Sequence, residues 1–503
     1  MVFFVLDKEF SIRTLLVLAL VVVSGVSVVG YLLIGPTPMY DATTMGITLA
    51  ICGLLSVALA KSDDALFSMF ALLTAFFHLF IFTRVLFFQY FPERTHLPLS
   101  VVLSARQINF GYAYIALGAT ALATGFSLAY MLLKNFVNKG RLVNDPLKIY
   151  PSSHLALVFL VTCLVQFYIA AGLGNSVLEH MYYGVEHKFW GVLSVLINGF
   201  LALVVVMTSL LASRKKDRGA RPLILFAGSF IFFMVMLGSR SGGITIFQVT
   251  LVALLVLYGN FRERLRDYLG FILAIVVISV IAFPVATAVR TAMLNKRDGL
   301  SVGATGAPAM TDVPAVTDVK QMSSRLGAAF DTVVMTISLD PDREMLSCSM
   351  NLPYALKSAV NIIVPGEVFA EAPINTALLW PFIYKLRDIK LLQRGYYESF
   401  IWTAWGTTYG MFGWGGGIVA LLMAGFVLQA LYMVISGLGG GLRPYFSAWF
   451  LLNVFSFYSA MGLDDWLVGM QRTLFSLCLV LLMLWAIGSL SRTRIFDQTE
   501  NKG

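Results

Sequence analysis

Residues 412–437, FGWGGGIVALLMAGFVLQALYMVISG, form a run of 26 residues without a single charge, and this run decides the fold class. One helix needs about 20 consecutive apolar residues to cross the hydrocarbon core of a bilayer. The whole chain has the same character, because 58% of its 503 residues are hydrophobic and only 13% are charged. Ordinary soluble chains carry about 25% charged residues. The composition therefore predicts an all-α, polytopic membrane protein and excludes a soluble enzyme, a secreted disulfide scaffold and a disordered regulator.

Other apolar runs of similar length lie on both sides of this one. We expect about twelve transmembrane helices in a single integral membrane domain that covers residues 1–503. The expected spans are 11–34, 43–60, 66–91, 110–133, 153–174, 190–213, 222–238, 243–259, 270–290, 412–437, 444–461 and 470–490. The longest connector is 291–411, between the ninth and tenth spans.

Lysine and arginine residues are concentrated in three short connectors, 134–148, 214–221 and 260–267. If twelve spans alternate in direction, all three connectors lie on one side, which the positive-inside rule identifies as the cytoplasm. Both termini are then cytoplasmic, and 291–411 is a large extracytoplasmic (periplasmic) loop. The net charge of +9 is explained by these connectors, so we expect no nucleic-acid partner.

Motifs for common cofactors are missing from the sequence. The four cysteines are widely separated and have neither zinc-ligand spacing nor the pattern of a disulfide framework. Walker A, GxGxxG and HExxH motifs are absent, and no cytoplasmic connector is long enough for a nucleotide-binding domain. We therefore expect no cofactor, no metal, and chemistry at the outer face or within the bundle. The first span has no cleavable-signal pattern before it and is expected to remain as an anchor.

The first candidate site is Gly238-Ser239-Arg240-Ser241-Gly242-Gly243, in the tight outer turn between two spans. Its glycines allow close approach of the backbone to a ligand, and the guanidinium of Arg240 suits a phosphate or diphosphate. Arg290, at the outer end of the 270–290 span, is a second candidate, and Arg297 follows about two helical turns later. The alternative for each is an arginine that anchors a span at the interface.

A third candidate lies where the long loop returns to the membrane. Arg394 and Glu398 are four residues apart, so on a helix they share a face and can pair. Aromatic residues follow and suit either stacking on sugar rings or an interfacial belt: Tyr396, Tyr397, Trp402 and Trp405.

A fourth candidate is the pair His78 and Arg84 inside the 66–91 span. Ionisable residues at membrane depth are costly, so they are functional candidates by default. Here they either form a structural polar network or line a groove for a lipid diphosphate.

Arginines at the outer mouth, beside lipid and aromatic rings, suit an anionic lipid-linked substrate such as a polyprenyl diphosphate sugar. The diphosphate is already a good leaving group, and fixed cations stabilise the charge that grows on it. The acceptor hydroxyl then needs positioning and a weak base.

The chain resembles the Wzy-type polymerases of O-antigens and related bacterial surface polysaccharides. The resemblance covers mainly 222–437, where an acidic residue precedes a Phe-Gly-x-x-Gly start of the next span. It rests on the order of five elements: 237–242 (LGSRSG), Arg290, 363–369 (IVPGEVF), 373–376 (PINT) and 409–417 (YGMFGWGGG).

This resemblance implies a membrane glycosyltransferase fold of the GT-C-like class, shared with O-antigen ligases and septal peptidoglycan polymerases, in a bacterial inner membrane. It implies polymerisation of undecaprenyl-diphosphate-linked oligosaccharide repeat units, with a chain-length regulator and a flippase as partners. Arg240 and Arg290 would contact the diphosphate, and Arg394 and Glu398 would lie near donor or acceptor.

Three alternatives remain open at this point. An O-antigen ligase would share the fold and the arginines, but such ligases usually have a histidine in the large outer loop, and 291–411 has none. A secondary transporter or flippase would be expected to show repeated halves and charges near the midplane. A scaffold subunit of an export complex would not need a polar outer mouth.

Overall fold

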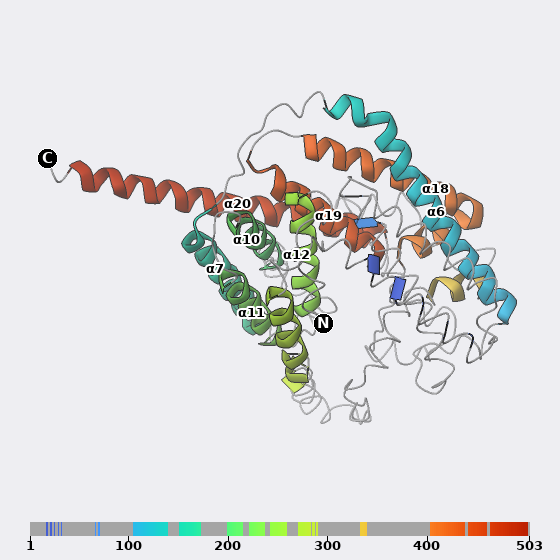
Figure 1. Cartoon of the computed structure of the whole chain (residues 1–503), viewed down its shortest axis with the longest axis horizontal. Helices are drawn as coiled ribbons and strands as arrows, with labels where there is room; N and C mark the ends of the chain where they lie inside the picture. Colours follow the sequence, from blue (N-terminus) through green and yellow to red (C-terminus); the bar gives the residue numbers. More distant parts are fainter. Residues whose placement is uncertain are drawn as a thin grey trace, which may run out of the picture.

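The structure is a computed structural model of the whole chain, shown in Figure 1. It describes residues 104–138, 150–172, 199–214, 221–236, 242–258, most of 270–289, 332–339, 403–437, 441–459 and 463–500, with isolated positions in 17–32 and 66–70. Every element among these residues is helical, as the sequence predicts. The labelled helices are α6 (Ala105–Asn138), α7 (Ser152–Gly172), α10 (Gly199–Arg214), α11 (Arg221–Met236), α12 (Gly242–Tyr258), α18 (Thr403–Gly437), α19 (Arg443–Ser459) and α20 (Leu463–Glu500).

Three of the described helices are long and apolar enough to cross a membrane, over Asn109–Lys134, Thr403–Gly437 and Gly469–Ser489. The 26 residues of the first rise about 39 Å at 1.5 Å per residue, which exceeds the roughly 30 Å hydrocarbon core. Shorter apolar helices lie in five further expected spans. The all-α membrane class is thus confirmed for the part of the chain that the structure describes.

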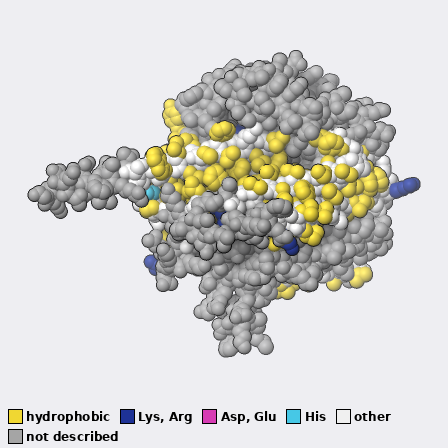
Figure 2. Space-filling view, turned by 90° about the horizontal axis from the view of Figure 1, so that it is seen from above, with side chains coloured by type: hydrophobic (Ala, Val, Ile, Leu, Met, Phe, Trp, Pro, Cys, Tyr) yellow, Lys and Arg dark blue, Asp and Glu magenta, His cyan; other side chains and the backbone are white. Residues whose placement is uncertain are grey.

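Large hydrophobic side chains are exposed on the outside of these helices. Leu225, Val280, Phe232 and Trp485 are each more than 60% exposed. Figure 2 shows hydrophobic side chains in a broad band across the described part of one face, with lysine and arginine at its margins. Such a band would be unfavourable in water, whereas lipid tails cover it without cost.

Pairs of helices far apart in sequence test the expected alternation of direction. Along α6 and α18 the contacts advance together, because Gly118 lies against Leu421 and Gly125 against Phe426. These two helices are therefore parallel, as the fourth and tenth of alternating spans must be. They lie side by side in Figure 1 and share the most extensive contact between any two described helices.

The pair α7 and α11 gives the same result for the fifth and seventh spans. The ring centroids of Phe159 and Phe226 are 5.7 Å apart, and those of Phe167 and Phe233 are 5.6 Å apart. Because both pairs advance in the same sense, α7 and α11 are also parallel. Within each of the two pairs, the relative direction agrees with the expected topology.

Two tyrosines connect helix ends that the expected topology assigns to the cytoplasmic side. The Tyr445 hydroxyl at the start of α19 forms a 2.7 Å hydrogen bond with Ser209 near the end of α10. The ring of Tyr150, before α7, lies 6.0 Å from that of Tyr445. Burial raises the pKa of the Tyr150 hydroxyl above its usual value.

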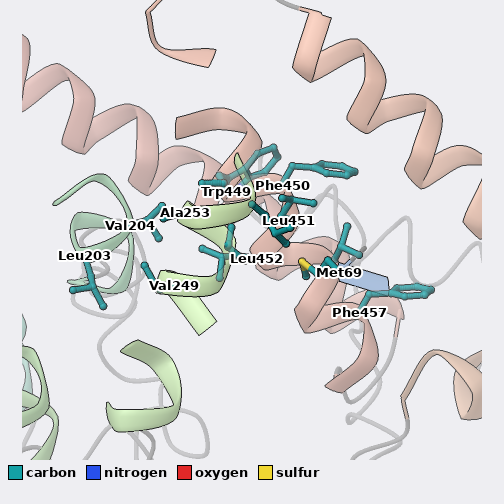
Figure 3. Close-up of a cluster of buried hydrophobic side chains, with 14 of the residues drawn as sticks. Met69, Leu203, Val204, Val249, Ala253, Trp449, Phe450, Leu451, Leu452 and Phe457 are labelled. Carbon is teal, nitrogen blue, oxygen red and sulfur yellow. The ribbon is translucent and has the colours of Figure 1, made fainter. Parts of the chain in front are cut away.

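The core lies where α10, α12 and α19 meet. Figure 3 shows Val204 of α10, Val249 and Ala253 of α12, and Leu451 and Leu452 of α19 facing one another, and all are at most 4% exposed. Aliphatic side chains fill this space without polar groups that would need partners. The core fixes the central helices, while the α6–α18 pair stands to one side.

Two stretches of the segment 291–411 lie among the described residues. Helix α18 begins at Thr403 instead of near 412. Residues 332–339 also form a helix, in which Val333, Val334 and Met335 are fully buried. Both stretches belong to the bundle because they carry small and apolar side chains that pack against α6.

Candidate functional site

None of the predicted site residues lies among the residues that the structure describes. This holds for the diphosphate-contacting and catalytic candidates Arg240, Arg290 and Glu398. It holds equally for the other binding candidates, which are Arg394, Arg297, Tyr396, Tyr397, Trp402, Arg84 and His78. What the structure describes is the start of the tenth span, directly after the segment that carries Arg394 and Glu398.

Helix α18 is broken into two legs at Gly413. This residue has φ 74° and ψ −172°, a conformation that is essentially restricted to glycine. The first leg is 403–412 and the second leg is 414–437. Gly413 belongs to the Phe-Gly-x-x-Gly pattern found in the sequence, so one glycine of that pattern has a defined backbone role.

The first leg is buried, whereas the second leg has buried, half-buried and exposed positions in turn. Every residue from Thr403 to Gly410 is buried. Thr403 itself is 1% exposed and has φ 60°, which is rare for a β-branched residue. The first leg is therefore a short polar-lined helix held inside the protein, ahead of the bend at Gly413.

Glycines allow α6 to approach α18 closely. Gly111, Gly118 and Gly125 recur every seven residues on α6, so they lie along one face. A Cβ added to Gly118 would lie 2.6 Å from Leu421 and 2.7 Å from Trp405, and one on Gly125 would overlap the Leu422 carbonyl oxygen. Small residues are the usual means by which membrane helices pack backbone to backbone.

Tyr114 of α6 contacts both legs of α18. Its hydroxyl lies 3.1 Å from Thr408 Oγ1 and donates a 3.3 Å hydrogen bond to the Trp405 carbonyl, both in the first leg. In the second leg, a Cβ on Gly417 would overlap this hydroxyl, and the Trp414 ring lies 6.0 Å away. The Tyr114 side chain thus packs in the angle between the two legs that meet at Gly413.

Some buried polar atoms of α18 have no hydrogen-bond partner in the described part of the chain. Thr403 Oγ1, at the first residue of the helix, and Trp414 Nε1, just after the bend, are among them. Buried polar groups in folded proteins are nearly always paired. Each of these atoms is therefore a place to look for a ligand contact.

Trp405 does not present its ring to solvent or to the membrane interface. Its side chain is fully buried against Gly118. This corrects both readings of Trp405 from sequence, as a sugar-stacking platform and as part of an interfacial belt. The cause is that helix α18 begins before Trp405 and packs that turn on α6.

A second polar cluster joins α19 and α20. Trp449 Nε1 donates to Thr473 Oγ1 at 2.9 Å, Thr473 Oγ1 donates to Asn453 Oδ1 at 3.1 Å, and Trp466 Nε1 donates to the Asn453 carbonyl at 2.7 Å. These groups satisfy one another, so the cluster is structural. Asp464 and Asp465 fall in the first turn of α20, where acidic residues are favourable beside the helix N-terminus.

Sequence reasoning missed the first leg of α18. A signal for it exists, because the uncharged run that contains 412–437 extends back to Ser399, directly after Glu398. The threonine and glycine residues between Ser399 and the 412–437 run lower the hydrophobicity of this stretch. The expected span was therefore not extended back over it.

Comparison with known proteins adds no assignment. No family model matches the sequence, and no curated protein or solved structure matches it either.

Proposed function

We propose that this protein is a membrane glycosyltransferase that polymerises undecaprenyl-diphosphate-linked oligosaccharide repeat units into a surface polysaccharide. The reaction takes place at the outer face of the bacterial inner membrane and needs no metal. The observation that carries the proposal is the bend at Gly413. It gives a defined structural role to the glycine of the Phe-Gly-x-x-Gly pattern on which the resemblance to Wzy-type polymerases partly rests.

One further observation, together with the charge pattern of the sequence, supports the proposal. The parallel direction of α6 and α18 agrees with a topology in which 291–402 precedes the tenth span on the extracytoplasmic side. On that topology Arg240 and Arg290 fall on the same side as Arg394 and Glu398. A cationic outer mouth next to lipid fits a lipid diphosphate donor.

In the proposed reaction the acceptor hydroxyl oxygen attacks the anomeric carbon of the donor glycan. The bond from that carbon to the diphosphate oxygen breaks, and the diphosphate leaves with the electron pair. Arg240 and Arg290 bind the departing charge, while Glu398 accepts the proton of the hydroxyl. The glycan is thereby extended by one repeat unit, and undecaprenyl diphosphate is released.

The test is a gel of surface glycan from cells in which the chromosomal copy is replaced by a full-length variant. Arg240→Ala and Arg290→Ala should each remove long chains and leave single repeat units attached. Arg443→Ala is the matched control, because Arg443 is exposed and lies on the cytoplasmic side of the same topology. Membrane-fraction immunoblots establish equal expression.

Each other outcome points elsewhere. An unchanged chain-length ladder in both arginine variants would refute the assignment of Arg240 and Arg290. Loss of all attached glycan would indicate a ligase, and accumulation of lipid-linked repeat units on the inner leaflet would indicate a flippase.

A further inference from the structure

The first leg of α18 folds back towards the second leg at the bend. The carbonyl oxygen of Thr408 lies 3.1 Å from where a Cβ on Gly417 would be, although nine residues of a straight helix rise about 13.5 Å. A Cβ on Gly118 of α6 would lie 2.7 Å from Trp405 and 2.6 Å from Leu421, although sixteen residues separate those two in the sequence. Both legs therefore reach the same turn of α6.

The start of the first leg lies deeper in the bundle than the bend does. The ring of Trp414, directly after the bend, stacks on Phe110 near the start of α6, with the ring centroids 5.7 Å apart. Trp405 instead contacts Gly118, about two turns further along α6. Gly118 is nine residues inside the span Asn109–Lys134, or about 14 Å from its outer end, close to the middle of a hydrocarbon core of roughly 30 Å. The first leg thus runs outward from the membrane interior to the bend.

The helix 332–339 runs outward as well. The hydroxyl of Ser338 donates a 3.2 Å hydrogen bond to the Gln107 carbonyl. Val334 lies one turn further in, where its Cα would be 2.9 Å from a Cβ on Gly111. The helix is therefore antiparallel to α6, with Thr332 at its inner end, and its first six residues are all buried.

Both helices begin at their inner ends, so the chain that leads to each of them has to descend from the outer face. The expected topology gives each descent to the segment 291–402, which starts outside after the ninth span. Non-helical backbone at membrane depth is tolerated only where protein encloses it or where it lines a water-filled cavity. A segment that descends twice is therefore part of the bundle and not a loop that only covers its mouth.

The geometry points to two re-entrant helices, 332–339 and 403–412, which bring the extracytoplasmic segment into the outer half of the membrane. One consequence for catalysis rests on the proposed function. Glu398 lies outside the described residues, but five residues of extended chain span at most about 18 Å, so its Cα is no farther than that from the Cα of Thr403. The first leg thereby holds the proposed base no higher than the headgroups of the outer leaflet, where the diphosphate of a lipid-linked donor lies.

The first test is photocrosslinking of the full-length protein in membranes. Trp405→p-benzoylphenylalanine places a photoreactive aromatic group where the buried Trp405 ring lies. After chymotryptic digestion, mass spectrometry should find its crosslinks on the peptides that contain Gly118 and Leu421. Trp449→p-benzoylphenylalanine is the matched control and should crosslink to α20, because Trp449 Nε1 lies 2.9 Å from Thr473 Oγ1.

A disulfide tests the helix 332–339 without replacing a buried residue. The protein for this test lacks its four cysteines and carries a protease site within 299–319, so that only a disulfide keeps the two fragments together after cleavage. The pair Gln107→Cys and Ser338→Cys should remain at full length on a non-reducing gel after mild oxidation. The control pair Gln107→Cys and Arg443→Cys should separate, because the expected topology places Arg443 on the opposite side of the membrane.

Two results would overturn the inference. One is a set of Trp405 crosslinks that misses both the Gly118 and the Leu421 peptides while the Trp449 control crosslinks to α20. The other is failure of the Gln107–Ser338 disulfide to form. Oxidation of that pair should leave the glycan ladder unchanged, because it locks an arrangement that already exists. A loss of long chains that dithiothreitol reverses would instead show that the helix 332–339 has to move, which contradicts a fixed re-entrant helix.

The crosslinks do not depend on activity, so the two proposals can fail separately. If both crosslinks form but the glycan ladders of Arg240→Ala and Arg290→Ala are normal, the re-entrant helices stand and the assigned polymerase site fails. If the ladders lose their long chains but the crosslinks are absent, the polymerase proposal stands and the re-entrant helices are refuted.

Discussion

The hydroxyl of Tyr114 lies 3.1 Å from Oγ1 of Thr408, and this contact joins α6 to the first leg of α18. The same Tyr114 side chain packs against Gly417 in the second leg and meets the Tyr409 ring at a centroid distance of 5.6 Å. One residue of the fourth span therefore fixes the angle at which the tenth span begins.

Tyr114→Phe should lower the free energy of unfolding by about 1 kcal/mol, the usual net contribution of a buried hydrogen bond. The loss is measured by SDS titration of the purified protein. A double-mutant cycle with Thr408→Val tests the cause, because removing both hydroxyls should cost less than the sum of the two single changes. Fully additive losses would show that the Tyr114–Thr408 contact is not the stabilising one.

Gly413→Ala should destabilise the protein by about 1–3 kcal/mol, since Ala does not readily adopt the backbone conformation of Gly413. It should also shorten the surface glycan, because the first leg would be redirected relative to the span. Gly415→Ala is the control: its Cβ would meet nothing within 4 Å. Similar glycan ladders in the two variants would contradict a role for the bend.

Gly125→Ala should separate α6 from α18. Its Cβ would overlap the backbone oxygen of Leu422, which cannot rotate away, so the cost should be about 1–3 kcal/mol, as for other overpacked sites. Gly469→Ala, in open space on α20, should be neutral or stabilising by up to about 1 kcal/mol. The comparison is again made by SDS titration, and equal stability of the two variants would argue against close backbone packing.

Much of the helical framework could be predicted from the sequence, because long uncharged runs leave few alternatives to a membrane helix. The parallel direction of α6 and α18 also follows from counting spans, but their packing on each other does not. The first leg of α18 could not be predicted, since its burial depends on a glycine face of α6 that is far away in sequence. Residues 332–339 were missed for a similar reason: Gly111 makes room for Val334, and no local pattern reveals that contact.

The candidate site was harder to predict than the fold. Charge and motif order single out arginines, and none of these arginines lies among the described residues. The polar lining of the first leg has no such signal, because its threonines are ordinary residues until their burial is known.

Single-cysteine labelling should place the two ends of the α6–α18 pair on opposite sides of the membrane. Arg106 at the start of α6 and Arg443 at the start of α19 are both exposed, so a thiol at either position should meet solvent. In a variant without Cys52, Cys163, Cys348 and Cys478, Arg106→Cys should react with a membrane-impermeant maleimide in intact spheroplasts. Arg443→Cys should react only after permeabilisation, because it follows a span that runs inward.

If both positions are labelled in intact spheroplasts, the chain crosses the membrane an even number of times between them. The expected odd number of spans between Arg106 and Arg443 would then be wrong. Labelling of Arg443→Cys alone would invert the orientation and place the N-terminus of α18 in the cytoplasm. That result would place Arg240, Arg290 and Glu398 on the cytoplasmic side, whereas the proposed reaction takes place at the outer face. The labelling pattern thus tests the orientation on which the glycosyltransferase proposal depends.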